Sequence, residues 1–353
     1  MPTKQIAPQD LDHVLQHAES AFMALRGARV FITGGTGFFG HWMLESMLHA
    51  NRALNLRLHA TVLTRSAASF RARSPHIALD PALLLLEGDI TSFRFPIAPY
   101  THIVHAATDS GGKQGERPAY VLANSILDGT RRVLEFAREC GASRLLYTST
   151  GAVYGRTTTL MRTPETFLSG PDPLALSSTY DEAKRMSENL CVAYSDQTPL
   201  EPVIARCFAF VGPHLPLDAH FAVGNFLRSA IRNETIVIRS DGTPRRSWLY
   251  MADLAVWLWT LLVRGQANRA YNVGSDHGMS IADAARLTAS TLRPELEVRI
   301  EGSVDLNHPL NSYVPAVDRA RNELGLEVRV SLDEALRRTA SWHGYVPEPM
   351  LIQ

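Results

Sequence analysis

The chain has 353 residues, 45% of them hydrophobic, so it can bury a large core as one big domain or two closely joined domains. Its 35 basic and 35 acidic residues balance, and no block of like charge occurs, which argues against nucleic acid or an anionic membrane as the main partner. No apolar run reaches the roughly 18–20 residues of a membrane helix. The N-terminus lacks the apolar core of a signal peptide, and we therefore expect a cytoplasmic protein.

The first predicted element is a helix over residues 8–26, where apolar side chains recur on one face. It precedes the first strand, and we assign residues 1–27 to an N-terminal helical extension. Strand-like runs then alternate with helix-length segments, which requires crossover connections and a parallel sheet covered on both faces. The runs are apolar throughout, as doubly buried strands should be. They lie at residues 28–33, 58–64, 83–89, 102–107, 144–150 and 202–208.

The second half of the chain is less regular. It contains a Pro-rich turn at 212–216, a strand at 235–242 and helices near 222–232, 251–263, 280–292 and 331–342. The pattern predicts an α/β protein, a doubly wound parallel sheet (Rossmann fold) with a smaller, discontinuous C-terminal substrate-binding region. We expect the Rossmann domain at 28–211, completed by about 248–275, and the substrate-binding region mostly at 212–353.

The first strand runs directly into "TGGTGFFG", residues 33–40. Gly35, Gly37 and Gly40 satisfy G-x-G-x-x-G, and a second spacing begins at Gly34. Glycines here let the backbone approach a pyrophosphate, which the N–H groups at the start of the next helix can bind. Between a strand and a helix, this motif predicts a dinucleotide site. The expected contacts are Gly34, Gly37, Phe38, Phe39 and Gly40.

The second strand ends in Thr64 and Arg65, where an acidic residue would bind a free ribose 2′-hydroxyl. A hydroxyl and an arginine suit a 2′-phosphate better, so NADP is favoured over NAD; an exposed arginine beside the site is the alternative. Asp89, followed by Ile90, ends the third strand. It can bind the adenine edge or cap the following turn, and both interpretations stay open.

A possible reaction centre comes from "TST" at 148–150 and "YDEAK" at 180–184. Tyr180 and Lys184 are spaced i, i+4 and leave one face of a helix. An ammonium beside a phenol lowers the tyrosine pKa, so Tyr180 can exchange a proton with a sugar or alcohol hydroxyl while a hydride moves to or from a nicotinamide. The Thr150 hydroxyl would fix the substrate oxygen.

The chain resembles the extended short-chain dehydrogenases/reductases of the NAD(P)-dependent nucleotide-sugar epimerase/dehydratase family over nearly its full length. The resemblance rests on "TGGTGFFG", "HAA" at 105–107, "TSTGAVYG", "YDEAK", "ARCFAFVGP" at 205–213, "SDGTPRRSWLYMADL" and "YNVGS" at 271–275. It implies a nucleotide-diphosphate sugar as substrate and Thr150, Tyr180 and Lys184 as catalytic residues. It also implies cofactor contacts at Ala106, Ala107, Tyr180 and Lys184, and substrate contacts at Thr150, Asn225 and Arg246.

Departures from the family pattern reduce the number of reactions that we expect of this chain. The resembling 4,6-dehydratases carry Asp and Glu after the catalytic threonine, and glucuronate decarboxylases keep a Glu, whereas this chain has Gly151 and Ala152. We therefore expect a C4 epimerase, with an NADPH-dependent 4-keto-sugar reductase as the alternative and a non-catalytic dinucleotide sensor as a remote one. Ile126 replaces a usual Asn, and residues 306–308 offer no clear match to a nucleotide-binding arginine.

Two further expectations concern assembly and metals. The helices near 118–140 and 177–195 carry more apolar residues than one sheet face can cover. Related proteins pair these helices, so we expect a homodimer with C2 symmetry. Cys140, Cys191 and Cys207 lack metal-ligand spacing. We expect reduced thiols in the core and no metal site.

Overall fold

The structure is a computed structural model that describes residues 3–108, 118–156, 160–219, 221–303 and 311–346. Its centre is a seven-stranded sheet in the order β11-β6-β5-β4-β1-β2-β3, and every neighbouring pair is parallel. The strands are β1 (Arg29–Thr33), β2 (His59–Thr64), β3 (Leu83–Glu87), β4 (His102–His105), β5 (Arg144–Thr150), β6 (Glu201–Cys207) and β11 (Arg269–Val273). The predicted parallel sheet is confirmed.

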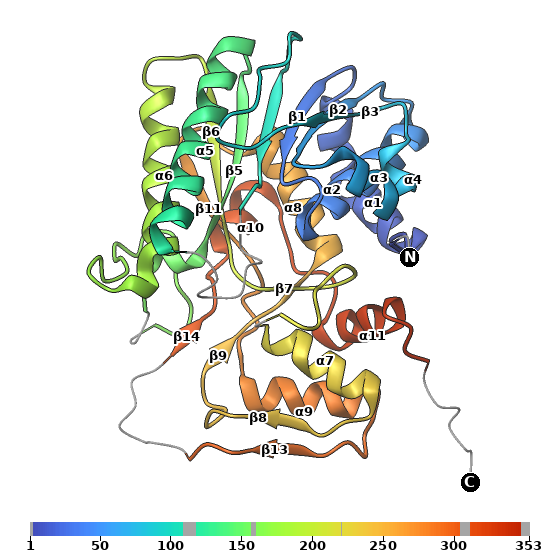
Figure 1. Cartoon of the computed structure of the whole chain (residues 1–353). Coiled ribbons are helices and arrows are strands. Elements are labelled where there is room, and N and C mark those ends of the chain that lie inside the picture. Colours follow the sequence, from blue (N-terminus) through green and yellow to red (C-terminus); the bar gives the residue numbers. More distant parts are fainter. Residues whose placement is uncertain (1–2, 109–117, 157–159, 220, 304–310, 347–353) are drawn as a thin grey trace.

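Helices cover both faces of this sheet (Figure 1). One face carries α1 (Pro8–Ala24), α2 (Phe38–Leu54) and α8 (Met251–Arg264), which pack on one another, and the other carries α5 (Ala119–Cys140) and α6 (Thr179–Ser195). Successive residues of β1 alternate between the two cores: Val30 and Ile32 belong to the first and Phe31 to the second. Two short helices, α3 (Ala67–Arg73) and α4 (Pro75–Ala78), follow β2.

The expectation that all strands are doubly buried is wrong for β3. It is an edge strand, so part of its surface has no covering layer, and Leu84 is 59% exposed. An apolar run in the sequence therefore did not distinguish an edge strand from a central one.

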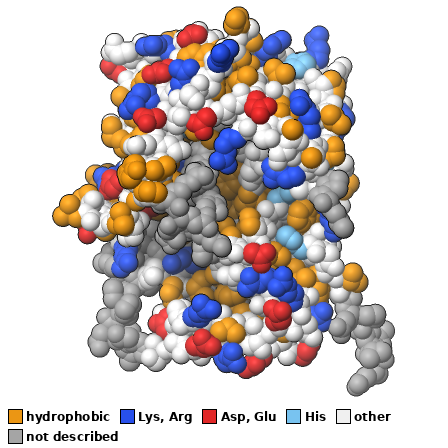
Figure 2. All heavy atoms as spheres, viewed as in Figure 1, with side chains coloured by type: hydrophobic (Ala, Val, Ile, Leu, Met, Phe, Trp, Pro, Cys, Tyr) orange, Lys and Arg blue, Asp and Glu red, His pale blue; other side chains and the backbone are white. Residues whose placement is uncertain are grey.

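A smaller lobe lies below the carboxyl ends of the strands (Figure 1) and is built from discontinuous segments of the second half. Its helices are α7 (Ala222–Arg232), α9 (Ile281–Leu292) and α11 (Leu332–Trp342); α10 (Asp318–Leu324) packs against β11. Its short strands form small sheets. In one, β8 (Ile236–Ile238) pairs with β13 (Val298–Ile300), and in another β9 (Arg245–Arg246) lies between β12 (Met279–Ser280) and β14 (Ser312–Tyr313). Next to the main sheet, β7 (Phe210–Val211) pairs with β10 (Leu249–Tyr250). Figure 2 shows the surface hollowed between the two lobes.

Within the described residues, no helix is both long and apolar enough to cross a membrane. Residues 306–308, where no nucleotide-binding arginine was recognised, lie outside the described part of the chain.

Candidate active site

The glycine loop between β1 and α2 is shaped by close backbone contacts. A Cβ on Gly34, whose φ is +74°, would lie 2.4 Å from the carbonyl oxygen of Ala106, and one on Gly40 would lie 2.2 Å from the backbone of Gly35. Gly37 is the exposed N-cap of α2 and has no such clash. The N–H of Gly37 donates to the carbonyl of Gly34 at 3.1 Å. Because the first N–H groups of a helix have no partner within it, Phe38 and Phe39 present donors at this cradle. The loop fits a dinucleotide pyrophosphate.

The end of β4 lies against this loop. The N–H of Ala107 donates to the Thr33 hydroxyl at 3.1 Å, and the same hydroxyl pairs with Nδ1 of buried His105 at 2.8 Å. The predicted residues Ala106 and Ala107 are therefore next to Gly34. Ile126 is buried on α5, and its carbonyl accepts a hydrogen bond from Thr130 at 2.7 Å.

The end of β2 leaves Arg65 exposed and Thr64 buried. Asp89 caps its own turn: its Oδ1 accepts from the N–H of Thr91 at 2.9 Å and from the Thr91 hydroxyl at 2.6 Å. These bonds, with a smaller contribution from Arg65, lower the pKa of Asp89. The capping role is therefore seen, and the adenine role stays a prediction. Ile90 packs on Gly129 of α5, where a Cβ would lie 2.9 Å from it.

Thr150, Tyr180 and Lys184, here called the Thr150 site, lie together because α6 packs against β5. Lys184 is 2% exposed; its Nζ donates to the carbonyl of Thr148 at 2.8 Å and lies 4.8 Å from the centre of the Tyr147 ring. Burial lowers the pKa of Lys184 to about 8. Thr150 ends β5, and its hydroxyl acts to lower the pKa of Tyr180.

The expected lowering of the Tyr180 pKa is wrong for this form of the protein. Burial, followed by the neighbouring phenol of Tyr313, raises the pKa of Tyr180 above its usual value, and the hydrogen bond from Thr150 opposes this only in part. The ammonium of Lys184 donates to the Thr148 carbonyl instead. Desolvation therefore outweighs the charge that the i, i+4 spacing suggested.

A buried ion pair behind Lys184 was missed. Glu188 follows Lys184 by one helical turn, and its carboxylate receives two hydrogen bonds from Nε and one from Nη2 of Arg206 on β6. It also accepts from the Ser149 hydroxyl at 2.5 Å. The repeat Tyr180, Lys184, Glu188 at four-residue spacing was the available signal. The pair ties α6 to β5 and β6 and so fixes the position of the Thr150 site.

The residue after Thr150 has no room for a side chain. A Cβ on Gly151 would lie 2.6 Å from the ring of Phe208, which packs with its centre 4.7 Å from that of Tyr313. The Tyr313 hydroxyl lies 3.2 Å from Oγ1 of Thr150. Neither aromatic residue was predicted to be part of the site, and for Tyr313 the sequence gives no local signal, because it is 163 residues from Thr150.

Arg246 lies on β9, beside Tyr313. Its Nη1 donates to the carbonyl of Arg245 at 2.7 Å and to Oδ1 of Asn311 at 3.1 Å, and its guanidinium is 5.8 Å from the centre of the Tyr313 ring. Burial lowers its pKa. Arg246 has no ion pair with a carboxylate in the described ranges, so the alternative of an ion-paired surface arginine is wrong there. Asn225 lies in the first turn of α7, half-buried.

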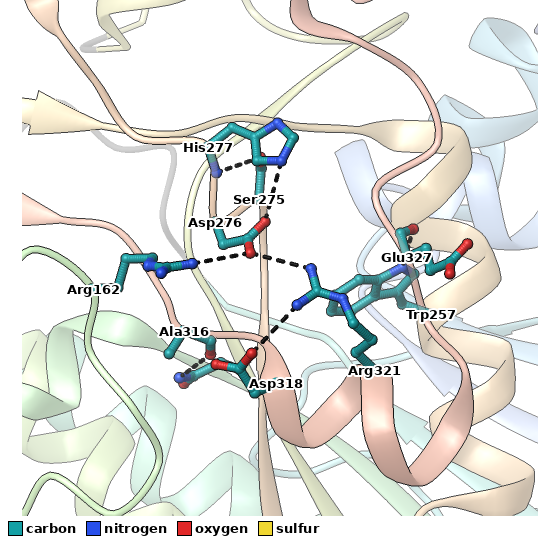
Figure 3. Close-up of polar contacts among 10 residues, drawn as sticks. Arg162, Trp257, Ser275, Asp276, His277, Ala316, Asp318, Arg321 and Glu327 are labelled. Atoms are coloured by element: carbon teal, nitrogen blue, oxygen red, sulfur yellow. Dashed lines mark hydrogen bonds and ion pairs between the residues drawn. The ribbon is translucent and has the colours of Figure 1, made fainter.

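A cluster around Asp276 holds the strand that carries Tyr313 (Figure 3). The buried carboxylate of Asp276, just after β11, accepts from Arg162 at 3.3 Å and from Arg321 of α10 at 3.1 Å. Thr163 follows Arg162 in the chain. Its carbonyl accepts a hydrogen bond from the N–H of Ala316 at 2.9 Å, and its own N–H donates to the carbonyl of Val314 at 2.8 Å. The segment at 161–163 and β14 are thereby fixed to the end of the main sheet.

Comparisons with known proteins agree with this geometry. Residues 30–274 match the model of the NAD dependent epimerase/dehydratase family. The chain is 28% identical over 310 residues to UDP-glucuronic acid decarboxylase 6 of Arabidopsis thaliana, covering 87% of this chain and 86% of that protein.

Solved structures with the same fold include an epimerase of Methanothermobacter thermautotrophicus (TM-score 0.78, 22% identity, 93% of this chain and 95% of that one). Another is the UDP-glucose 4-epimerase of Thermotoga maritima, solved with UDP-glucose (TM-score 0.74, 20% identity, 89% and 98%). The dinucleotide that the glycine loop fits is accordingly NAD or NADP. The match over most of its length shows that the chain belongs to the NAD-dependent epimerase/dehydratase family.

Proposed function

We propose that this enzyme epimerises a nucleotide-diphosphate sugar at C4. As the phenolate, Tyr180 takes the proton of the C4 hydroxyl while the C4 hydride leaves, which gives a 4-keto sugar. When bound, the nicotinamide supplies the hydride acceptor and donor. Return of hydride and proton to the opposite face of C4 gives the epimer, with no net oxidation. Thr150 orients the oxygen, and Lys184 places a positive charge next to the reacting groups.

The observation that carries this proposal is the surface next to Thr150. A Cβ atom on residue 151 would lie 2.6 Å from the Phe208 ring, so the ring leaves no space for a side chain there. Residue 152 is an alanine. Water elimination needs an acid and a base beyond Tyr180, and these positions provide none. Hydride transfer out and back needs only Tyr180 and its partners.

Substrate binding is proposed to rest on Arg246. Its guanidinium is half-buried and bonds only neutral acceptors in the described residues, so its charge is available to an anion. A buried, uncompensated guanidinium is costly, and a diphosphate would supply the missing bidentate partner. Asn225 is proposed as a second contact.

An alternative is reduction of a 4-keto sugar with NADPH, favoured by exposed Arg65 at the end of β2. The name of the Arabidopsis relative raises decarboxylation as well. The three outcomes differ in products: an epimerase needs no added reductant, a reductase consumes NADPH, and a decarboxylase releases CO₂ from UDP-glucuronate.

The test is to incubate purified protein with UDP-, CDP-, GDP- and dTDP-sugars, including UDP-glucuronate, with and without NADPH. We expect NMR spectra to show an epimer at C4 without NADPH consumption. NADPH-dependent product would favour the reductase, and release of CO₂ would overturn the proposal. Tyr180→Phe is the control for contaminating activity.

We also propose a homodimer formed through α5 and α6. The outward residues of these helices include Tyr120, Met186 and Val192, which are 68%, 48% and 41% exposed. Light scattering at micromolar concentration should give twice the monomer mass of 39.0 kDa.

A further inference from the structure

Tyr313 connects the two lobes at the Thr150 site. It lies on β14, where it pairs with Arg246 of β9 in the smaller lobe, while its hydroxyl lies 3.2 Å from Oγ1 of Thr150 in the main sheet. The same hydroxyl donates to the carbonyl of Cys207 on β6 at 3.4 Å. Burial raises the pKa of Tyr313 to about 12, so it is a neutral phenol near pH 7.

The position of Tyr313 is constrained on both sides. Its ring packs on Phe208. The segment that follows β14 is bridged at Pro315 to Thr163, next to the Arg162–Asp276–Arg321 cluster (Figure 3). In this form of the protein, neighbouring backbone and side chains therefore place the Tyr313 hydroxyl against Thr150.

The hydrogen-bond capacity of Thr150 is limited. A threonine hydroxyl has one proton and two acceptor positions. One acceptor position is occupied by the N–H of Ala152 at 3.2 Å. When Tyr313 donates to Cys207, its oxygen takes the one proton of Thr150, and Thr150 has no proton left to donate to Tyr180. In that arrangement Tyr180 keeps its proton.

We propose that Tyr313 is a positioning residue that occupies the Thr150 hydroxyl in the free enzyme and keeps Tyr180 protonated until a substrate hydroxyl takes its place. The proposal rests on the proposed function, in which Tyr180 is the acid–base group. When Tyr313 is displaced, the Thr150 hydroxyl can donate its hydrogen bond to the Tyr180 oxygen instead. This bond stabilises the phenolate of Tyr180. Substrate binding near Arg246 and activation of Tyr180 are thus linked through β9 and β14.

The test follows Tyr180 directly, by NMR of protein labelled with ¹³C at the tyrosine Cζ and saturated with NAD⁺ or NADP⁺. The chain has 10 tyrosines, and the signal of Tyr180 is the one that disappears in Tyr180→Phe. We expect Tyr313→Phe to lower the pH at which Tyr180 ionises by about one unit or more, a tenfold change in its ionisation constant. In a Thr150→Val background, Tyr313→Phe should have no such effect.

An unchanged or raised ionisation pH in Tyr313→Phe, or an equal fall in the Thr150→Val background, would overturn the proposal. If Tyr180 remains protonated in both proteins up to the pH at which circular dichroism reports unfolding, the proposal also fails. Tyr313→Leu serves the same comparison where the Phe variant does not fold. No nucleotide sugar is used, so a failure to find turnover would bear on the proposed function alone.

Discussion

The glycine loop at 33–40 and the Thr150 site lie at the carboxyl ends of the same parallel sheet, but they depend on opposite features of the chain. At the loop, missing side chains allow backbone to touch backbone, as where Gly40 meets Gly35. At the Thr150 site, polar side chains are buried, and Lys184 is 2% exposed. A loop of this kind is sensitive to added atoms, whereas the buried site is sensitive to protonation and to lost polar groups.

The largest expected effect would break the loop. Gly40→Ala places a Cβ 2.2 Å from the backbone of Gly35, which cannot shift easily, so we expect a loss of about 4 kcal/mol or more in unfolding free energy. In the matched variant Gly37→Ala, the new Cβ would lie 3.4 Å from the Gly34 carbonyl oxygen. That variant should fold but bind dinucleotide more weakly. Thermal melting and calorimetric titration separate the two, and equal melting temperatures would contradict the steric argument.

At the Thr150 site, removing one oxygen should affect chemistry alone. Tyr180→Phe removes the proton-transfer group, so we expect turnover of the identified substrate to fall by roughly 10²–10⁴-fold. Dinucleotide binding, measured by calorimetry, should change little. Tyr194→Phe, on the same helix, is the control and should retain activity. Wild-type turnover in Tyr180→Phe would show that another group transfers the proton.

Burial of Lys184 has a cost that depends on pH. Its folded pKa of about 8 lies below the unfolded value of about 10.4, so between these pH values the unfolded chain holds a proton that the folded one lacks, and stability rises with pH. Below about pH 8 both forms are protonated and the folded protein bears the full cost, on the order of 3 kcal/mol.

Lys184→Met should therefore be inactive but more stable at pH 7. The gain is smaller than the full cost because the hydrogen bond to the Thr148 carbonyl is also lost. The advantage should shrink as the pH rises from about 8 to 10.4. Denaturant unfolding at several pH values measures it, with exposed Lys4→Met as the control. A difference that does not vary with pH would refute the electrostatic explanation.

The smallest expected effect concerns Arg65, which is proposed to make the protein bind NADP more tightly than NAD. Charge-assisted hydrogen bonds to a 2′-phosphate are worth roughly 1.5–3 kcal/mol, so Arg65→Ala should weaken NADP binding by about one to two decades and leave NAD binding nearly unchanged. Arg71→Ala, exposed on α3, is the control. If both dinucleotides weaken equally, Arg65 stacks on the adenine instead, and NAD becomes the favoured cofactor.

Local sequence was sufficient for much of this protein. The strands β1 to β6 and the helices α1, α5, α6, α7, α8, α9 and α11 were predicted within a few residues, because hydrophobic periodicity and glycine placement are local properties. The glycine loop and the Tyr180–Lys184 spacing were predictable for the same reason: the residues concerned lie within one turn or one helix.

Only the tertiary structure decided the rest. Two-residue strands such as β9 and β14 have no periodicity to detect, yet their pairing brings Tyr313 to Thr150 from 163 residues away. The sign of the Tyr180 pKa shift likewise depends on burial by groups remote in sequence, which outweighs the adjacent ammonium. Spacing along a helix determines which side chains share a face, but desolvation and long-range contacts determine their protonation, and these exist only in the folded chain.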